Sequence, residues 1–385
     1  DKSEFVELEF EQGVPVALNG EKEPGNRTEE TNLGDLICDA LVWGAEREGT
    51  EVDAAVTNGG GIRAAIKPGD VTKKDINTVL PFGNTVAVIY VTGAELLEAL
   101  EASTYSLPVG GFPQVAGINF TLSTAVAYDA NAETYPASTY YGPKSINRVV
   151  INSINGKEFK ADDTYAVVTN NFVAGGGDTY YAFAAASAQF DTGIPLDEAV
   201  MEYVTTELKG VIGAQYAAPQ GRILLNPFKD VKVSSWFGKY VIDLYNDGII
   251  NGTSATTYAP NDTLTWAAAL KLLLVSNGDL KAADATGADW SKNVIAKAAE
   301  LGLVAADLDG AKAISRLEFC QVAAKLNKLA ESKTESKFTD CTDGYVMALV
   351  DAKVINGMTE TTFEPDASLT RAQIAKIIYQ LNLIE

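Results

Sequence analysis

The chain has 385 residues, of which 46% are hydrophobic, and its 51 acidic and 30 basic residues give a formal net charge of −21. This length suffices for two or three domains, and the hydrophobic fraction excludes a wholly disordered protein. The acidic balance repels nucleic-acid backbones and anionic lipid, so we expect neither as a partner, and an anionic ligand would require a local cluster of arginines.

The first part of the chain alternates between helical and strand periodicity. Intermixed strands and helices indicate an α+β domain around a mixed sheet, over residues 1–225. The pattern predicts strands at 51–57, 85–92, 115–122, 146–152, 165–170 and 221–225, and helices at 32–46, 93–102 and 194–208.

Beyond Asn226-Pro227 the pattern changes and predicts a mainly α-helical second domain, residues 226–385. Its sequence repeats: Phe-x-Asp occurs at 228 and 338, Ile-Asn-Gly at 250 and 355, and Leu-Thr before an apolar helix at 264 and 369. A degenerate copy lies between them. We predict three units, at about 228–278, 286–330 and 338–385, which pack on one another because each is too small to bury a core alone.

Three glycine-rich blocks in the first domain each place a turn beside a side chain suited to a nucleotide. Arginine can pair with phosphate, phenylalanine can stack on a base, and aspartate can accept hydrogen bonds from sugar hydroxyls. Taken singly, Phe82 could instead fill the core, Arg63 could be an ordinary surface charge, and Asp178 could cap the next segment. The blocks are Asn58-Gly-Gly-Gly-Ile-Arg63, Leu80-Pro-Phe-Gly-Asn84 and Asn170-Asn-Phe-Val-Ala-Gly-Gly-Gly-Asp178.

Together with Glu30-Thr-Asn-Leu-Gly-Asp-Leu36, these blocks resemble, in order and spacing, the C-terminal domain of the 5′-nucleotidase family. The resemblance implies a substrate-recognition domain. It places the hydrolysis and two divalent metals in a separate N-terminal metallophosphatase domain. It also implies phosphate contacts by Arg27 and Arg63, stacking by Phe82 and Phe172, polar contacts by Asn58 and Asp178, and close backbone approach at Gly60.

The second domain resembles the S-layer homology repeat, in three copies. The resemblance implies binding of secondary cell-wall polysaccharide, with the arginine of a Thr-Arg turn meeting an acidic group of the glycan. Arg316 and Arg371 hold this position, and Trp266 replaces the arginine in the first unit. Trp236 and Trp290 are further candidates for glycan contact. The alternatives are core anchors for these two tryptophans and solvated helix-cap charges for the arginines.

Histidine is absent, which removes Ser-His-Asp and Cys-His catalytic arrangements, and no carboxylates stand at the spacing of a two-metal site. We therefore expect no catalytic residue and no metal or other cofactor in this chain. Cys38 is expected in the core, whereas Cys320 and Cys341 are either paired or both buried thiols.

No apolar run reaches the roughly 18 residues of a membrane span. The charged start of the sequence leads us to expect numbering that begins inside a precursor or at a processed end. Together the two resemblances predict the nucleotide-recognition part of an extracellular, cell-wall-anchored bacterial 5′-nucleotidase-type hydrolase, inactive by itself. Its partners would be a nucleotide or nucleoside and a wall glycan. The alternative is a non-enzymatic surface or adhesion protein with a vestigial nucleotidase-like domain.

Overall fold

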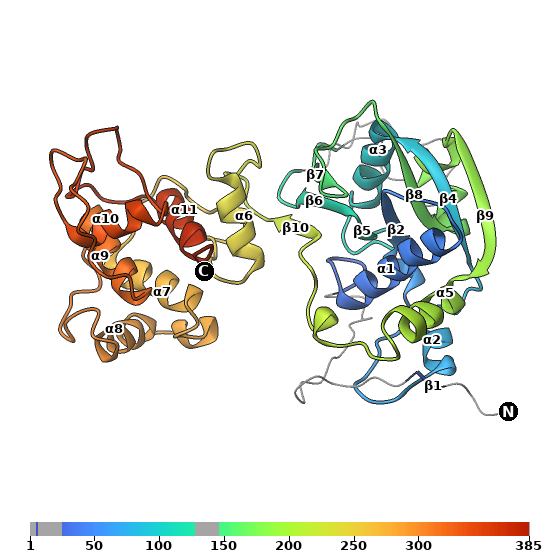
Figure 1. Cartoon of the computed structure of the whole chain (residues 1–385), viewed down its shortest axis with the longest axis horizontal. Coiled ribbons are helices and arrows are strands. Elements are labelled where there is room, and N and C mark those ends of the chain that lie inside the picture. Colours follow the sequence, from blue (N-terminus) through green and yellow to red (C-terminus); the bar gives the residue numbers. More distant parts are fainter. Residues whose placement is uncertain (1–4, 7–24, 128–145, 385) are drawn as a thin grey trace. The chain divides into compact units, whose positions relative to one another are not determined.

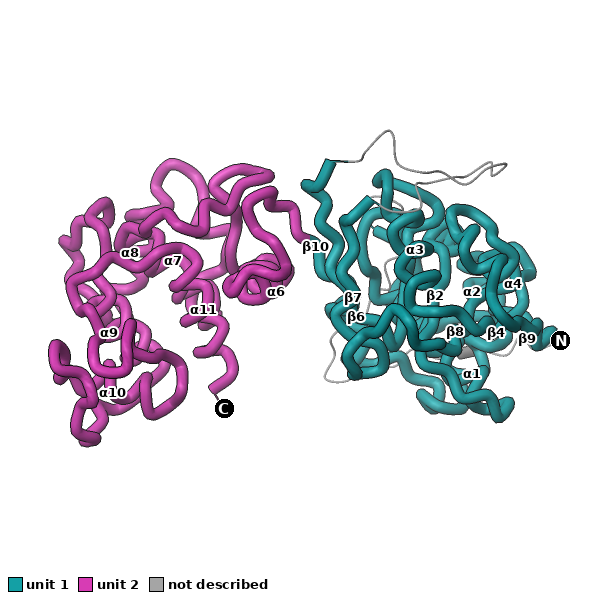
Figure 2. The backbone as a smooth tube through the Cα atoms, turned by 90° about the horizontal axis from the view of Figure 1, so that it is seen from above, with its two compact units in different colours: residues 1–225 teal, residues 226–385 magenta. Residues whose placement is uncertain are grey.

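The structure is a computed structural model that describes residues 5–6, 25–127 and 146–384. It divides into two compact units, unit 1 (residues 1–225) and unit 2 (residues 226–385), coloured separately in Figure 2. The charged start of the sequence lies outside the described residues. Among the described residues, no helix combines the length and apolar character needed to cross a membrane.

Unit 1 is built around a five-stranded mixed sheet (Figure 1). The β2–β8 pair is parallel, and the other three pairs are antiparallel. This arrangement confirms the predicted α+β class. The strands in spatial order are β5 (Pro113–Ala116), β2 (Ala54–Asn58), β8 (Thr164–Asn170), β4 (Thr85–Thr92) and β9 (Ala188–Pro195).

The sheet separates two hydrophobic cores because alternate residues of a strand point to opposite faces. Ala55 enters one core and Ala54 the other, and Val88 and Ile89 divide in the same way. The first core is covered by α1 (Asn32–Arg47), α2 (Lys73–Val79) and α5 (Leu196–Glu202), and the second by α3 (Gly93–Ser103) with β6 (Ile118–Ser123) and β7 (Val149–Ile154).

Two smaller sheets complete unit 1. One has the strand order β10–β6–β7, where β10 is Ile223–Asn226, and the other pairs β1 (Phe5–Val6) with β3 (Val71–Thr72). Cys38 is fully buried in α1, which confirms its place in the core.

Two predicted elements in unit 1 were wrong in their extent. The strand expected at 115–122 is two strands in different sheets, because Gly117 adopts a φ of +71° and turns the chain. The helix expected at 194–208 begins at Leu196, since Ile194 and Pro195 end β9, and it finishes in a π-helical turn at Tyr203–Glu207. The sequence pattern also missed β9 and α2.

Unit 2 is helical, and its helices pack in pairs, the last of which joins the final helix to the first. α7 packs on α8, α9 on α10, and α11 on α6. The first and last helices of the unit are therefore neighbours. The α-helices in the described part of unit 2 are α6 (Gly238–Asn246), α7 (Trp266–Ser276), α8 (Trp290–Glu300), α9 (Arg316–Leu326), α10 (Gly344–Asp351) and α11 (Arg371–Leu381).

Helices α7, α9 and α11 begin in the same way. Each is capped by a hydroxyl, from Thr265, Ser315 and Thr370, which satisfies a backbone N–H of the first turn. The segments before these helices contact one another through three isolated β-bridges, Thr263 with Thr370, Thr265 with Ala313, and Ser315 with Ser368. Each turn is thereby joined to the other two.

The loops near 230 and 340 are built alike. The Asp230 carboxylate accepts hydrogen bonds from the backbone N–H groups of Tyr258 and Ala259, and the Asp340 carboxylate accepts them from Phe363 and Glu364. Ala259 and Glu364 share a positive φ, of 59° and 60°.

Cys320 and Cys341 are both buried thiols and form no disulfide with each other, which decides between the two alternatives given for them.

Candidate functional site

A pocket of ≈570 Å³ lies in unit 1, and all seven residues predicted to bind substrate line it. They come from four separate stretches of the chain. The complete lining is Arg27, Asn58, Gly60, Gly61, Arg63, Phe82, Asn84, Val109, Gly110, Gly111, Phe172, Asp178 and Thr179.

The sheet topology explains why these stretches meet. β2 and β8 are parallel, so their carboxyl ends lie at the same edge of the sheet. The loop after β2 carries Arg63, and the short helix α4 (Asn171–Ala174), which follows β8 directly, carries Phe172. β4 runs antiparallel to β8, and its first residues pair with the end of β8, with Val86 opposite Asn170. Phe82, which precedes β4, is therefore delivered to the same edge.

Both phenylalanines of the pocket are exposed. Phe82 has 60% of its surface accessible and Phe172 has 43%. The alternative that Phe82 fills the core is therefore wrong. The Arg63 guanidinium lies 5.7 Å from the centroid of the Phe82 ring, and its Nη1 donates to the Gly60 carbonyl at 3.2 Å. Two accessible aromatic faces in one pocket offer stacking surface for a planar ligand.

Asn58 and Asp178 act as a pair inside the pocket. Asn58 Nδ2 donates to Asp178 Oδ2 at 2.7 Å, and Asn58 Oδ1 accepts from Asn170 Nδ2 at 3.1 Å. Asn58 is thereby held in one orientation. Burial raises the pKa of Asp178, while the hydrogen bond from Asn58 and the charge of Arg27 oppose the rise. Asp178 has a φ of +52°, an uncommon backbone conformation for a non-glycine residue.

The glycines after β2 have a packing role besides the close approach to a ligand that was predicted for Gly60. A Cβ on Gly59 would lie 1.7 Å from the Asn26 carbonyl oxygen, and one on Gly60 would lie 2.9 Å from the Gly110 carbonyl oxygen. The Gly60 N–H also donates to the Gly110 carbonyl at 2.7 Å. Both glycines therefore let the pocket loops pack on one another, and Gly60 also lines the pocket.

Sequence reasoning missed several residues of the lining: Asn84, Val109, Gly110, Gly111 and Thr179. The pair Gly110-Gly111 was a usable signal, because it marks another place where backbones can approach closely. Two polar atoms at the pocket, Arg27 Nε and Thr179 Oγ1, are buried without a hydrogen-bond partner in the described part of the chain. Buried polar atoms of this kind are normally satisfied, which points to a ligand or water as their partner.

The two arginines of unit 2 are bound to its backbone. Arg371 Nε donates to the Tyr258 carbonyl at 2.7 Å, and its guanidinium carbon lies 4.5 Å from the Tyr258 ring centroid. Arg316 Nη2 donates to the Asn356 carbonyl at 2.7 Å, and its guanidinium lies over Phe363 at 4.7 Å.

Arg316 is only 6% exposed, so the alternative of a solvated helix-cap charge is wrong for it. Its Nε has no hydrogen-bond partner among the described residues, and neither arginine forms an ion pair with them. Burial lowers the pKa of Arg316.

The two candidate tryptophans differ in exposure. Trp236 is 58% exposed and makes an edge contact with Phe237, at 5.4 Å between ring centroids, so it is not a core anchor. Trp290 is half-buried at the start of α8, where Lys271 Nζ lies 5.6 Å from its ring. Trp266, at the position that arginine holds in the other two units, is buried.

No group of three or more His, Cys, Asp or Glu side chains is arranged to hold a metal ion within residues 5–6, 25–127 and 146–384. The chain's described residues therefore do not fit the two-metal centre that the family resemblance implies for the separate domain.

Comparisons with known proteins match each unit separately. Residues 14–185 match the model of the 5′-nucleotidase C-terminal domain, and residues 227–269 and 340–375 match the S-layer homology domain. Both predicted resemblances are thereby confirmed, while the middle unit is not matched and the count of three stays a prediction.

Similar proteins include the trifunctional nucleotide phosphoesterase protein YfkN of Bacillus subtilis, 42% identical over 46% of this chain. A 5′-nucleotidase of Vibrio cholerae is 31% identical over 57% of this chain, and the cell wall protein Lmo0130 of Listeria monocytogenes is 31% identical over 44%. The matches cover 11%, 36% and 21% of these relatives, so the chain corresponds to a minor part of each.

Among solved structures, the 5′-nucleotidase precursor of Thermus thermophilus is 34% identical, with a TM-score of 0.46, over 57% of this chain and 39% of that one. By sequence, residues 14–185 are similar to the 5′-nucleotidase C-terminal domain, and residues 227–269 and 340–375 are similar to the S-layer homology domain.

Proposed function

We propose that unit 1 is the nucleotide-recognition domain of a 5′-nucleotidase-type phosphoester hydrolase. The observation that carries the proposal is the convergence of two exposed phenyl rings and two arginines on one pocket. Phe82 and Phe172 hold the base between them, and Arg27 and Arg63 bind the phosphate. Each charge-assisted hydrogen bond is worth about 1.5–3 kcal/mol, and each stacked contact about 1–3 kcal/mol.

The Asn58–Asp178 pair completes the recognition. In this proposal Asp178 accepts hydrogen bonds from the sugar, and Asn58, oriented by Asn170, contacts the base. Thr179 Oγ1 and Arg27 Nε gain a partner from the ligand or from water bound with it. The pocket volume suits a ligand of nucleotide size, because small-molecule sites commonly occupy about 300–1,000 Å³.

Hydrolysis belongs, in the same proposal, to a separate metallophosphatase domain with two divalent metals. The chain has no histidine, and its described residues form no metal-binding cluster. The chain's part is to bind the base and sugar and to present the phosphate to that domain. Relatives called 5′-nucleotidase that extend well beyond the region matched by this chain support the division of labour.

Unit 2 is proposed to be three S-layer homology repeats that bind secondary cell-wall polysaccharide and keep the protein at the surface of a bacterium. The closed pairing of the helices and the three alike helix starts support the count of three. Arg316 and Arg371 are the anionic-group contacts in this proposal. Neither guanidinium forms an ion pair with the described residues, and that of Arg316 is also buried, which favours an anion as its partner. Trp236 and Trp290 contact sugar rings in the same proposal. The relative named a cell wall protein supports the location.

Titration calorimetry of the full chain with adenosine tests the role of unit 1. We expect saturable binding, and a loss of about 5- to 150-fold in affinity for Phe172→Ala, the equivalent of one stacked base. Phe190→Ala is the matched control, because Phe190 is 41% exposed on β9 and does not line the pocket.

No adenosine binding up to millimolar ligand would contradict the proposal and favour the non-enzymatic surface protein. Equal losses for Phe172→Ala and Phe190→Ala would show that the effect does not come from the pocket.

A further inference from the structure

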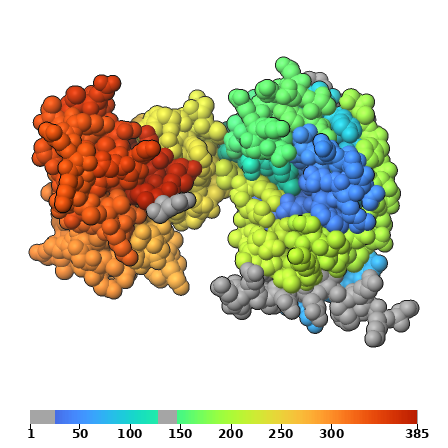
Figure 3. Space-filling model, in the orientation of Figure 1, coloured from blue at the N-terminus to red at the C-terminus, as the bar shows by residue number. Residues whose placement is uncertain are grey.

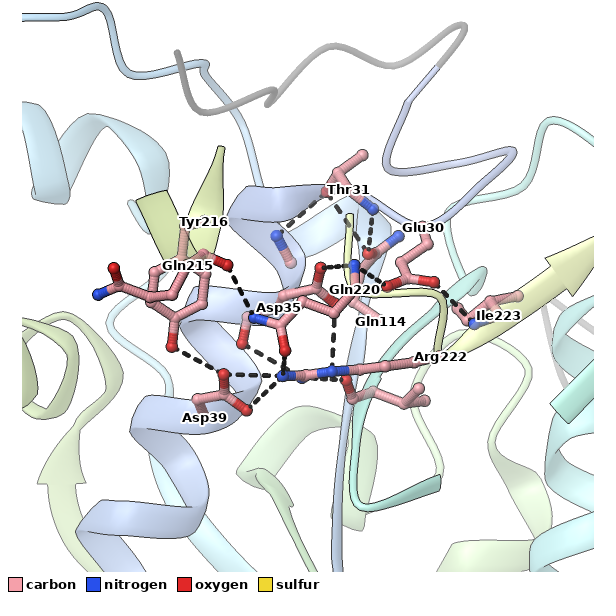
Figure 4. A network of polar contacts seen from close by, with 12 residues as sticks. Glu30, Thr31, Asp35, Asp39, Gln114, Gln215, Tyr216, Gln220, Arg222 and Ile223 are labelled. Atoms are coloured by element: carbon pink, nitrogen blue, oxygen red, sulfur yellow. Dashed lines mark hydrogen bonds and ion pairs between the residues drawn. The ribbon is translucent and has the colours of Figure 1, made fainter. Parts of the chain in front are cut away.

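Gln114 is a fully buried polar residue whose side chain holds the loop that carries Arg27. It lies on β5, and its Nε2 donates to the carbonyl of Glu29 at 2.8 Å and to that of Asn26 at 3.4 Å. Its Oε1 accepts from the backbone N–H of Thr31 at 3.0 Å (Figure 4). One amide group therefore holds the backbone on both sides of Arg27.

The first turn of α1 is shaped around this amide. A Cβ on Gly34 would lie 2.1 Å from Gln114 Oε1, so glycine is the residue that leaves room for it. The Thr31 hydroxyl, which caps α1, also donates to Asn26 Oδ1 at 2.5 Å. The helix start and the Arg27 loop are thus joined through Gln114 as one hydrogen-bonded assembly.

The Gln114 side chain forms hydrogen bonds with the loop that carries Arg27 and with none of the segments that carry Phe82 and Phe172 in the described chain. The Arg27 carbonyl accepts from the N–H of Val109, which also lines the pocket. Phe82 precedes β4 and Phe172 follows β8, and in the described chain the Gln114 side chain has no hydrogen bond to either of these segments. A defect at Gln114 should therefore reach Arg27 and spare the stacking.

We propose that Gln114 is the positioning residue for Arg27 and determines how strongly the pocket prefers a phosphorylated nucleoside over the nucleoside itself. The inference rests on the proposed function of unit 1. A buried amide that satisfies three backbone groups leaves the loop one favourable conformation. Without the amide those groups lose their partners, the loop shifts, and the Arg27 guanidinium no longer meets the phosphate.

The test compares AMP with adenosine by titration calorimetry of the full chain. Wild type should bind AMP more tightly. Gln114→Leu should weaken AMP binding about tenfold, the equivalent of one charge-assisted hydrogen bond, and change adenosine binding by less than about twofold. Arg27→Ala should have the same pattern, and Arg27→Ala combined with Gln114→Leu should lose little more than Arg27→Ala alone, because both changes remove one contact.

Two further variants protect the test against a simple loss of folding. Gly34→Ala should displace the amide and lower the preference for AMP in the same direction, although alanine is the better helix former. Ile151→Ala, in β7, is the control for lost stability. It should leave the ratio of AMP to adenosine affinity unchanged, since Ile151 is buried in the second hydrophobic core and does not line the pocket.

Unchanged AMP affinity in both Gln114→Leu and Gly34→Ala would overturn the inference, and so would parallel losses of AMP and adenosine. Equal affinity of wild type for the two ligands would also overturn it while leaving base recognition intact. Absence of binding of either ligand to wild type would instead overturn the proposed function, and the inference with it.

Discussion

For Phe82 and Phe172, the residue type indicates what the side chain can bind, whereas the surroundings decide whether a ligand can reach it. Their chemistry was evident in the sequence, because an aromatic ring beside a glycine turn can stack on a base. Whether the Phe82 ring faces a pocket or fills the core was open, and only its exposure of 60% decides it. Arg316 shows the opposite case, a side chain that was expected to be accessible and is buried. A charge at a helix start was expected in solvent or on a glycan, and the structure buries it against Phe363.

Asp35 is another residue whose state depends on its neighbours. It is fully buried in α1, beside Glu30 and Arg222 (Figure 4). Burial, helped by the Glu30 charge and opposed by Arg222, raises its pKa from the ordinary 3.8 to about 8. The Arg222 Nε lies 3.6 Å from the Asp35 carboxylate, and its Nη2 pairs with Asp39 at 2.7 Å.

This pKa predicts a pH dependence of stability. The folded state holds the Asp35 proton more tightly than the unfolded chain, so protonation favours folding. The contribution of Asp35 to stability should therefore be largest below about pH 4 and decline as pH rises to about 8. Urea unfolding at pH 5, 7 and 9 measures the effect. Asp35→Asn should flatten the decline, and an equally steep decline in this variant would contradict the assignment.

At the scale of elements, the described helices and strands follow from local rules where one signal dominates. The strand at 85–92 and the helix beginning at Gly93 are found where predicted, with Thr92 as the cap. The errors occur where long-range contacts decide. The chain turns at Gly117, because the strands on either side of it pair in different sheets. The apolar run at 194–208 starts as a strand, because β9 pairs with β4.

A comparison of Gly117 with Gly156 distinguishes the cost of a positive φ from the cost of steric crowding around an added Cβ. Both have a φ of +71°, but a Cβ on Gly117 would lie 2.5 Å from the Asp53 carbonyl oxygen, whereas one on Gly156 meets nothing within 4 Å. Gly156→Ala should cost about 1 kcal/mol of unfolding free energy, from the conformation alone, and Gly117→Ala clearly more. Chemical denaturation measures both, and equal costs would contradict the assigned role of crowding.

A second element-scale feature ties the segment after α5 to α1. Arg222 donates to the Val115 carbonyl at 2.7 Å and pairs with Asp39, and Tyr216 donates to the same carboxylate at 2.7 Å. Figure 3 shows this segment, in yellow-green, bordering the blue surface of α1. A further contact joins the same segment to the residues before α1, because the Glu30 carboxylate accepts from the Ile223 N–H at 2.7 Å.

At the scale of the whole molecule, the chain combines two self-contained units with different chemistry. Unit 1 presents arginines and aromatic rings in a pocket, although the net charge of the chain is −21. The two arginines of the pocket thus place local positive charge within a generally acidic chain, as the proposed binding of a phosphate requires. In unit 2 the helices α7, α9 and α11 begin in the same way, the segments before them contact one another, and the last helix packs on the first.

The purified chain is expected to release no phosphate from AMP, with or without Mn²⁺, Zn²⁺ or Mg²⁺. It has no histidine, and its described residues form no cluster able to hold a metal pair. A phosphate-release assay measures this. Metal-dependent turnover that disappears in Phe172→Ala would contradict the prediction, whereas turnover unaffected by that change would indicate a contaminating phosphatase.

The amino-acid sequence by itself determined the two kinds of unit, the repeat of unit 2 and the candidate binding residues, because periodicity, glycine turns and side-chain chemistry are local properties. The tertiary structure alone decided that Arg27, Arg63, Phe82 and Phe172 line one pocket. Arg63, Phe82 and Phe172 meet because β2, β4 and β8 pair at one edge of the sheet, whereas Arg27 lies on a loop that packs on β5. The tertiary structure also decided that Gln114 holds the Arg27 loop, a contact between residues more than 80 positions apart.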